Sequence, residues 1–137
     1  MRMRIVTFGL VAALAACAAP ARVSAPAPQS AADGVVTVHL SNFAFDPAQL
    51  RLKKDVPVRL RLVNDSDGGH DFSAPGLFAA STLPPGVPAP PNGAIDVGAN
   101  QTVEIALVPH TAGTYPLECT HFLHSAFGMT GSIEVVP

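Results

Sequence analysis

The chain has 137 residues, of which 48% are hydrophobic and 13% are charged, and this composition excludes a disordered polyelectrolyte. The net charge of −2 gives no general electrostatic reason to bind nucleic acid, so nucleic acid is not an expected partner. Fourteen Pro and eleven Gly argue against a helical bundle, because Pro interrupts helices and marks turns and strand edges.

The first sixteen residues have the pattern of an export signal. Arg2 and Arg4 give a positively charged start, and residues 5–16 form an uncharged apolar run. A membrane-spanning helix needs about 20 residues, whereas the apolar region of a signal peptide needs about 7–15. Residues 1–16 are therefore predicted to be a signal peptide that is absent from the folded domain.

The signal ends in Leu14-Ala15-Ala16-Cys17, which resembles the lipobox of bacterial lipoproteins. The resemblance implies that Cys17 is the lipid attachment residue and that the protein is a membrane-anchored lipoprotein of the periplasm. Ala18, rather than Asp, follows the Cys, and by the same resemblance this favours the outer membrane. The alternative is an ordinary secretory signal that happens to contain a Cys.

The next segment, residues 17–34, begins at the Cys and is mostly Ala, Pro and Ser. It has too few large apolar side chains to form a core, so it is predicted to be a flexible tether. The folded domain is expected to cover residues 35–137.

From residue 35 onward, apolar and polar residues alternate with a period of two, which is typical of half-buried strands. About seven or eight short strands, separated by Gly, Pro, Asp and Asn, predict an all-β sandwich of two packed antiparallel sheets. The Pro-rich residues 75–93 are expected to form a long loop with one helical turn near residues 77–80. The clearest alternating segments are residues 35–41, 50–53, 58–62, 103–107 and 133–135.

Four residues carry soft or borderline metal-ligand chemistry. Cys119, His124 and Met129 are spaced C-x4-H-x4-M before the last predicted strand, and His70 follows a Gly-rich turn. A Cys and two His with a weak axial Met are the donors of blue-copper sites, whereas zinc more often takes a second Cys or a carboxylate. Calcium and magnesium require oxygen ligands. The pattern favours copper; the alternative is a buried structural Cys with a Met in the core.

With Gly113-Thr114-Tyr115 and Gly131, these residues make the segment 35–137 resemble the cupredoxins, the plastocyanin and azurin group of type 1 copper proteins. The resemblance implies a Greek-key β-sandwich that holds one type 1 copper ion. It also implies a ligand set with three residues in the plane of the metal, His70, Cys119 and His124, and Met129 as the axial ligand.

The same resemblance implies a one-electron carrier between redox protein partners of unknown identity. Four protein ligands leave no strong open position for a substrate, so the protein is not expected to be an enzyme. A periplasmic copper-handling protein, that is a chaperone, buffer or tolerance factor, is the alternative function. A metal-free sandwich used as a binding module is a third possibility.

The sequence departs from the family pattern at two places. Asp71 stands where many cupredoxins have an Asn that ties the ligand segments together, and Thr120 is its possible hydroxyl partner. An ionised Asp71 is expected to favour Cu(II) and to lower the reduction potential, whereas a protonated Asp71, or one whose hydrogen bonds are well satisfied, is not. Phe122-Leu123 replace the Pro-Gly that often precedes the second His, and this leaves the loop conformation open.

The remaining His residues have less defined roles. His121, inside the ligand loop, is interpreted either as an extra ligand for handing copper over or as a solvent-facing residue. His39 and His110 are expected at the surface.

Two groups of residues suggest contact surfaces. Phe78, Leu123 and Phe127 are predicted either to form an apolar patch around His124 or to pack beneath the loop. A basic group is predicted to share one side of its strands, where it either docks an acidic redox partner or is a solvated sheet face. Its members are Arg51, Lys53, Lys54, Arg59 and Arg61.

Overall fold

The computed structural model describes residues 34–137. The predicted signal peptide, Cys17 and all but the last residue of the predicted tether lie outside the described residues. Within the described range, no helix has both the length and the apolar character needed to cross a membrane.

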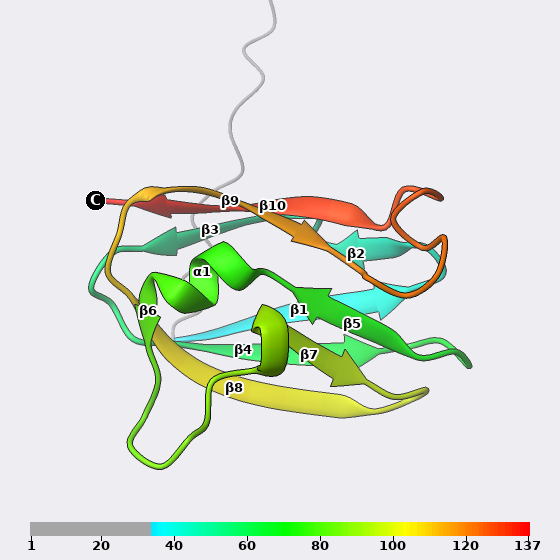
Figure 1. The fold of residues 1–137 in the computed structure, drawn as a ribbon, viewed down its shortest axis with the longest axis horizontal. Helices are drawn as coiled ribbons and strands as arrows, with labels where there is room; N and C mark the ends of the chain where they lie inside the picture. The colour runs from blue at the N-terminus through cyan, green and yellow to red at the C-terminus, as the bar shows by residue number, and fades with distance from the viewer. Residues whose placement is uncertain (1–33) are drawn as a thin grey trace, which may run out of the picture.

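Residues 34–137 form a sandwich of two sheets, so the all-β prediction is confirmed (Figure 1). The structure has ten strands rather than seven or eight, because several two- to four-residue segments also pair. The first sheet has the order β2 (Ala44–Asp46), β1 (Val35–Ser41), β4 (Val58–Asn64), β8 (Thr102–Pro109) and β6 (Ser81–Thr82). The second has the order β3 (Gln49–Lys53), β10 (Thr130–Val136), β9 (Gly113–Glu118), β5 (His70–Ser73) and β7 (Ala94–Val97).

The sheets are mixed rather than antiparallel, which corrects the sequence-based expectation. β1 pairs in parallel with β4, and β3 pairs in parallel with β10. Parallel neighbours require a connection that crosses over. Here the chain leaves the first sheet after β2, adds β3 to the second sheet and returns as β4 beside β1. Alternation along one strand reveals its buried face but not its partner, so the sequence pattern did not contain this pairing.

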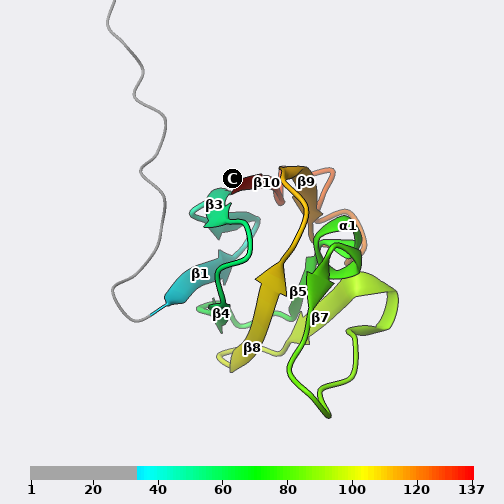
Figure 2. The same cartoon turned by 90° about the vertical axis from the view of Figure 1, so that its left-hand side faces the viewer.

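The two sheets face each other (Figure 2), and their buried apolar side chains form one core. In β1, Val36, Val38 and Leu40 are buried, as their alternation with polar residues predicts. Burying a side chain of this size contributes about 1.5–3 kcal/mol. Many such contacts give a stiff frame for the loops at its ends.

The Pro-rich segment contains more regular structure than expected. The helical turn is α1 (Pro75–Ala79), and a 3-10 turn, η1 (Pro91–Gly93), precedes β7. Pro75 opens α1, where the missing backbone N–H costs nothing because the first N–H groups of a helix have no partner within it. The expected helical turn is therefore confirmed, slightly earlier in the chain than predicted.

One end of the sandwich gathers the predicted metal ligands. β5 begins and β9 finishes at this end, where the loop of residues 119–129 joins β9 to β10 (Figure 1). The pairing of Ser73 with Glu118 holds β5 against β9. His70, the first residue of β5, consequently lies next to a loop about fifty positions further along the chain.

Candidate metal centre

Three of the predicted ligands bring their donor atoms together. The Nδ1 atoms of His70 and His124 are 3.2 Å apart. The Sγ of Cys119 lies 3.4 Å from Nδ1 of His124 and 4.0 Å from Nδ1 of His70. Two donor atoms that each lie about 2.0–2.3 Å from one ion stand roughly 3–4 Å from each other. The three donors therefore have the spacing of ligands to a single ion.

Met129, the predicted axial ligand, is fully buried and is joined to the other ligands through the backbone. Its N–H donates to the carbonyl of His124 at 3.0 Å, and its carbonyl accepts from the N–H of Cys119 at 3.1 Å. These two hydrogen bonds close the loop on itself. The three loop ligands are consequently held by one another as well as by the strands.

The loop contains one residue with left-handed backbone next to a ligand. Leu123 has φ of 64°, a conformation that costs a non-Gly residue roughly 1–2 kcal/mol. The resemblance places Gly at this position in many relatives, and Gly adopts this conformation freely. Leu123 therefore adopts a backbone conformation that Gly would adopt without strain.

Burial controls the protonation of the ligands in the metal-free protein. It raises the pKa of the Cys119 thiol above its ordinary value. It also lowers the pKa of His70, and the neighbouring His124 and His121 lower it further. A neutral imidazole is ready to bind a metal, whereas the thiol must first lose its proton.

Asp71 and Thr120 meet behind the ligands. The N–H of Thr120 donates to Oδ1 of Asp71 at 2.6 Å, and the Thr120 hydroxyl donates to Oδ2. Asp71 is buried at 3% exposure, whereas Thr120 is exposed, so the contact is only partly buried. The Asp occupies the place of the family's Asn and makes the same kind of connection between the two ligand segments.

His121 is not brought together with the three donors. Its ring lies beside that of His124, with 5.4 Å between the ring centres. Its own donor atoms belong to a second group with Asp71 and Asp96, whose ligand atoms all lie within 4.8 Å of one another. His121 is partly exposed.

Side chains that the sequence interpretation missed also reach the site. Phe43 packs edge-on against His124, with 4.9 Å between the ring centres. Asn42 and Ser66 contact the far nitrogen of His70. Asn42 and Phe43 belong to the turn between β1 and β2, and Ser66 belongs to the turn before β5. Only the folded chain brings these turns to the site. No local sequence pattern marks them.

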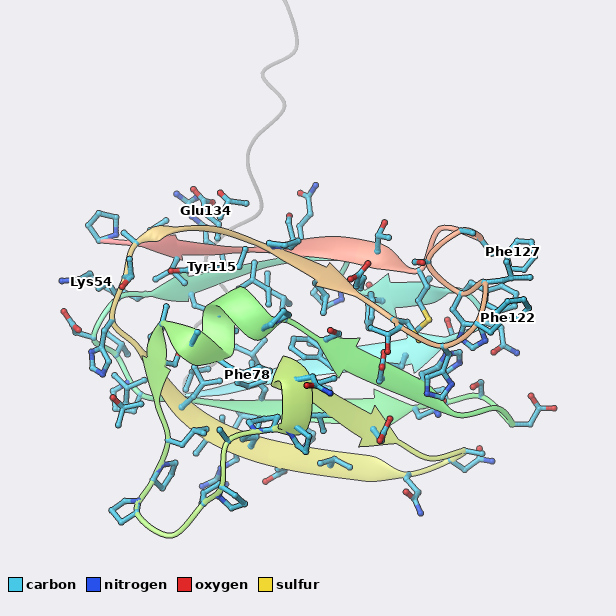
Figure 3. All side chains as sticks on the ribbon, in the orientation of Figure 1. Lys54, Phe78, Tyr115, Phe122, Phe127 and Glu134 are labelled. Carbon is cyan, nitrogen blue, oxygen red and sulfur yellow. The ribbon has the colours of Figure 1, made fainter. Side chains whose placement is uncertain are left out.

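An apolar surface surrounds the exposed side of the loop, and we call Phe43, Phe122, Leu123 and Phe127 the loop-end patch. These side chains are 38%, 87%, 47% and 63% exposed, respectively. Phe78, which was expected here, lies instead in the core at 7% exposure (Figure 3). It belongs to α1, which packs against the interior.

The predicted basic face is not formed, because its residues lie on different sheets. Arg51 is on β3, and its Nε lies 3.2 Å from Oε2 of Glu134. Arg61 is on β4, and its Nε donates to Oε1 of Glu104 at 2.6 Å. Alternation within each strand did not reveal that β3 and β4 belong to opposite layers. His39 and His110 are exposed, as expected.

The chain is similar to a known protein family. A family model described as a cupredoxin-like domain matches residues 7–90. The chain belongs to this family. The match includes His70 and ends before Cys119. The loop of residues 119–129 lies outside the match, so its ligands are identified by the positions of their donor atoms. No curated protein sequence matches the chain.

Solved structures share the cupredoxin fold. Reduced auracyanin from Roseiflexus castenholzii superposes with a TM-score of 0.59 at 19% identity, over 76% of this chain and 98% of the other. Auracyanin B gives 0.56 at 24% identity, over 75% and 88%. A multi-copper oxidase from Pediococcus acidilactici gives 0.59 at 21% identity, over 82% of this chain but only 28% of the oxidase.

The residues present fit the cofactor of a cupredoxin. The buried sulfur and two imidazole nitrogens are soft and borderline donors, and together with Met129 they form the cluster typical of a type 1 copper site. The cofactor is therefore one copper ion, which His70, Cys119, His124 and Met129 would hold.

Proposed function

We propose that this cupredoxin is a one-electron carrier between redox protein partners and is not an enzyme. The observation that supports the proposal best is the convergence of Cys119 Sγ with the Nδ1 atoms of His70 and His124 within 4.0 Å. With the weak Met129 thioether as the fourth, the protein supplies all the expected ligands. No open position then remains for a substrate, in contrast to catalytic metal sites.

The frame around the ligands suits repeated electron transfer. Copper supplies a one-electron couple whose two states prefer different geometries. The chain holds its ligands by β5, by the end of β9 and by the hydrogen bonds that close the loop. Ligands that stay in place on oxidation keep the reorganisation small, and a small reorganisation lowers the barrier to electron transfer.

His124 supports a route for the electron. It is the one partly exposed member of the three-donor group, and it lies beside the loop-end patch. A partner that contacts these apolar side chains lies close to a metal ligand. The electron then reaches the partner without passing through the core. We propose this end of the sandwich as the place of electron exchange.

The test is the visible spectrum of the copper-loaded protein. An intense thiolate-to-copper charge-transfer band is expected, and Cys119→Ser is expected to remove it. Cys17→Ser is the matched control, because it removes the other Cys of the chain and leaves the band unchanged. A colourless Cu(II) protein would overturn the assignment.

Copper handling is a second candidate, supported by the group of His121, Asp71 and Asp96 beside the ligand loop. Such a group offers an incoming or leaving ion a temporary set of donors. A copper-handling protein is expected to transfer its copper to a chelator rapidly. His121→Ala is expected to slow that transfer. A carrier keeps its copper through many electron transfers, and the same substitution leaves copper release unchanged.

We also propose export to the periplasm and anchoring at the outer membrane through lipid on Cys17. The support is the sequence of the signal and of the residues after it. Several acyl chains bind a membrane firmly, since each buried CH₂ contributes about 0.8 kcal/mol. Fractionation of cells tests this: the wild type is expected with the outer membrane, and Cys17→Ser is expected to leave that fraction. An unchanged distribution would contradict lipid attachment.

A further inference from the structure

The nitrogen of His70 that faces away from the metal centre contacts two side chains. Nε2 is 3.0 Å from Oδ1 of Asn42 and 2.9 Å from Oγ of Ser66. The His70 side chain is fully buried. In a neutral imidazole only one nitrogen carries the proton, and the hydrogen bond of one nitrogen decides whether the other is free for a metal.

Asn64 fixes the direction of the hydrogen bonds that reach His70. It is buried at 1% exposure, and its Nδ2 donates to the carbonyls of Gly68, Val97 and Gly98 at 2.8, 3.0 and 3.0 Å. Carbonyl oxygens only accept, so the amide nitrogen must point toward them. The Oδ1 of Asn64 therefore points the other way, where the N–H of Ser66 donates to it at 2.9 Å.

The hydroxyl of Ser66 connects Asn64 to His70. It lies 2.7 Å from Asn64 Oδ1 and 3.1 Å from the carbonyl of Gly68, and both of these are acceptors. The hydroxyl proton is consequently used toward one of them. Only lone pairs of Ser66 Oγ remain for His70, so Nε2 must donate its proton to Oγ. The proton on Nε2 leaves Nδ1 without one.

We propose that Ser66 and Asn64, with Asn42, are positioning residues that hold His70 in the tautomer and orientation in which Nδ1 binds copper. The inference rests on the proposed copper site, and it assigns to that site three residues that the family pattern did not indicate. Acceptors on Nε2 also make the imidazole a better donor through Nδ1. This favours Cu(II) over Cu(I) and lowers the reduction potential.

The experiment compares Ser66→Ala with two matched variants. Ser66→Thr keeps the hydroxyl. Ser81→Ala removes a hydroxyl that donates to the carbonyl of Leu77 at 2.7 Å, on β6 at the other end of the sandwich (Figure 1). For each protein the Cu(II) affinity, the reduction potential and the thermal midpoint are measured.

Ser66→Ala is expected to lose about tenfold or more in Cu(II) affinity, the usual effect of removing a hydrogen-bond partner of a ligating His. If the loss is confined to Cu(II), each factor of ten raises the potential by about 59 mV. Ser66→Thr and Ser81→Ala are expected to keep both wild-type values, although Ser81→Ala loses stability. A Ser66→Ala protein that loses only stability would show a structural role and overturn the inference.

A second readout uses the copper-free protein. Nitrogen-15 NMR of the His70 ring is expected to show a proton on Nε2 in the wild type and a mixture of tautomers when Ser66→Ala is combined with Asn42→Ala. A proton on Nδ1 in the wild type overturns the inference even when the copper band is present. Absence of the copper band overturns the proposed function instead, so the two failures are distinguishable.

Discussion

Thr120 donates two hydrogen bonds to one carboxylate, that of Asp71: its N–H meets Oδ1 at 2.6 Å and its hydroxyl meets Oδ2. Thr120 follows Cys119, and Asp71 follows His70, so this contact joins the segments that carry two ligands. Both carboxylate oxygens accept, as those of an ionised Asp do. The connection therefore brings a negative charge close to the metal centre as well as holding it together.

Asp71→Asn removes the charge and keeps the connection, because an amide accepts from the Thr120 N–H and donates to its hydroxyl. The reduction potential is expected to rise, since Cu(II) loses a favourable charge interaction. At an effective dielectric constant of about 20, one charge near the site is worth roughly 1–2 kcal/mol, or about 50–100 mV. Protein-film voltammetry measures the shift.

Asp96→Asn is the control for this prediction. Asp96 is the register partner of Asp71 on β7, but it is exposed, so water screens its charge. A smaller shift is expected from it. An unchanged potential in Asp71→Asn would show that the carboxylate does not tune the copper.

The sequence predicted the fold class because alternation in strands such as residues 35–41 reports directly on burial. It predicted the ligands because Cys119, His124 and Met129 are close in sequence and their donor types are unusual together. It did not predict sheet order, since Arg51 and Arg61 look alike in sequence and lie on different layers. Contacts such as Phe43 on His124 join distant turns through the tertiary fold, and no local pattern encodes them.

Copper uptake is expected to release protons. Burial raises the pKa of Cys119, so its thiol is protonated at neutral pH in the metal-free protein, whereas copper binds the thiolate. The pKa of His70 is lowered, so this ligand is already neutral at pH 7 and contributes none. The Cys119 thiol is therefore expected to release one proton per ion at pH 7, and the affinity for copper falls as the pH falls.

Titration of copper into weakly buffered protein with a pH indicator measures this release. Cys119→Ser is expected to abolish it, because the serine hydroxyl keeps its proton. Release that persists in Cys119→Ser would mean that the proton comes from another group.

Gly131→Ala is expected to destabilise the sandwich at the start of β10. A Cβ at this position would stand 2.2 Å from the carbonyl oxygen of Ala48, which accepts a hydrogen bond from the N–H of Ser132. Backbone cannot move aside as a side-chain tip does, so a loss of about 1–3 kcal/mol is expected in denaturant unfolding. Gly68→Ala is the control, because its Cβ would meet nothing closer than 3.9 Å. Equal stabilities of the two variants would contradict the close approach.

The loop-end patch predicts how two copies of the protein exchange electrons. Phe122, its most exposed member, lies at the end of the molecule opposite Lys54 (Figure 3). Phe122→Glu places a charge in the proposed contact, and in a self-exchange encounter the two copies meet with like charges at this position. The electron self-exchange rate, measured by NMR line broadening, is expected to fall at least about tenfold at low salt. Val56→Glu, an equally charged change at an exposed apolar residue next to Asp55, is expected to leave the rate unchanged. Both variants should keep the wild-type copper spectrum, so equal losses of rate would show that net charge and not the patch governs the exchange.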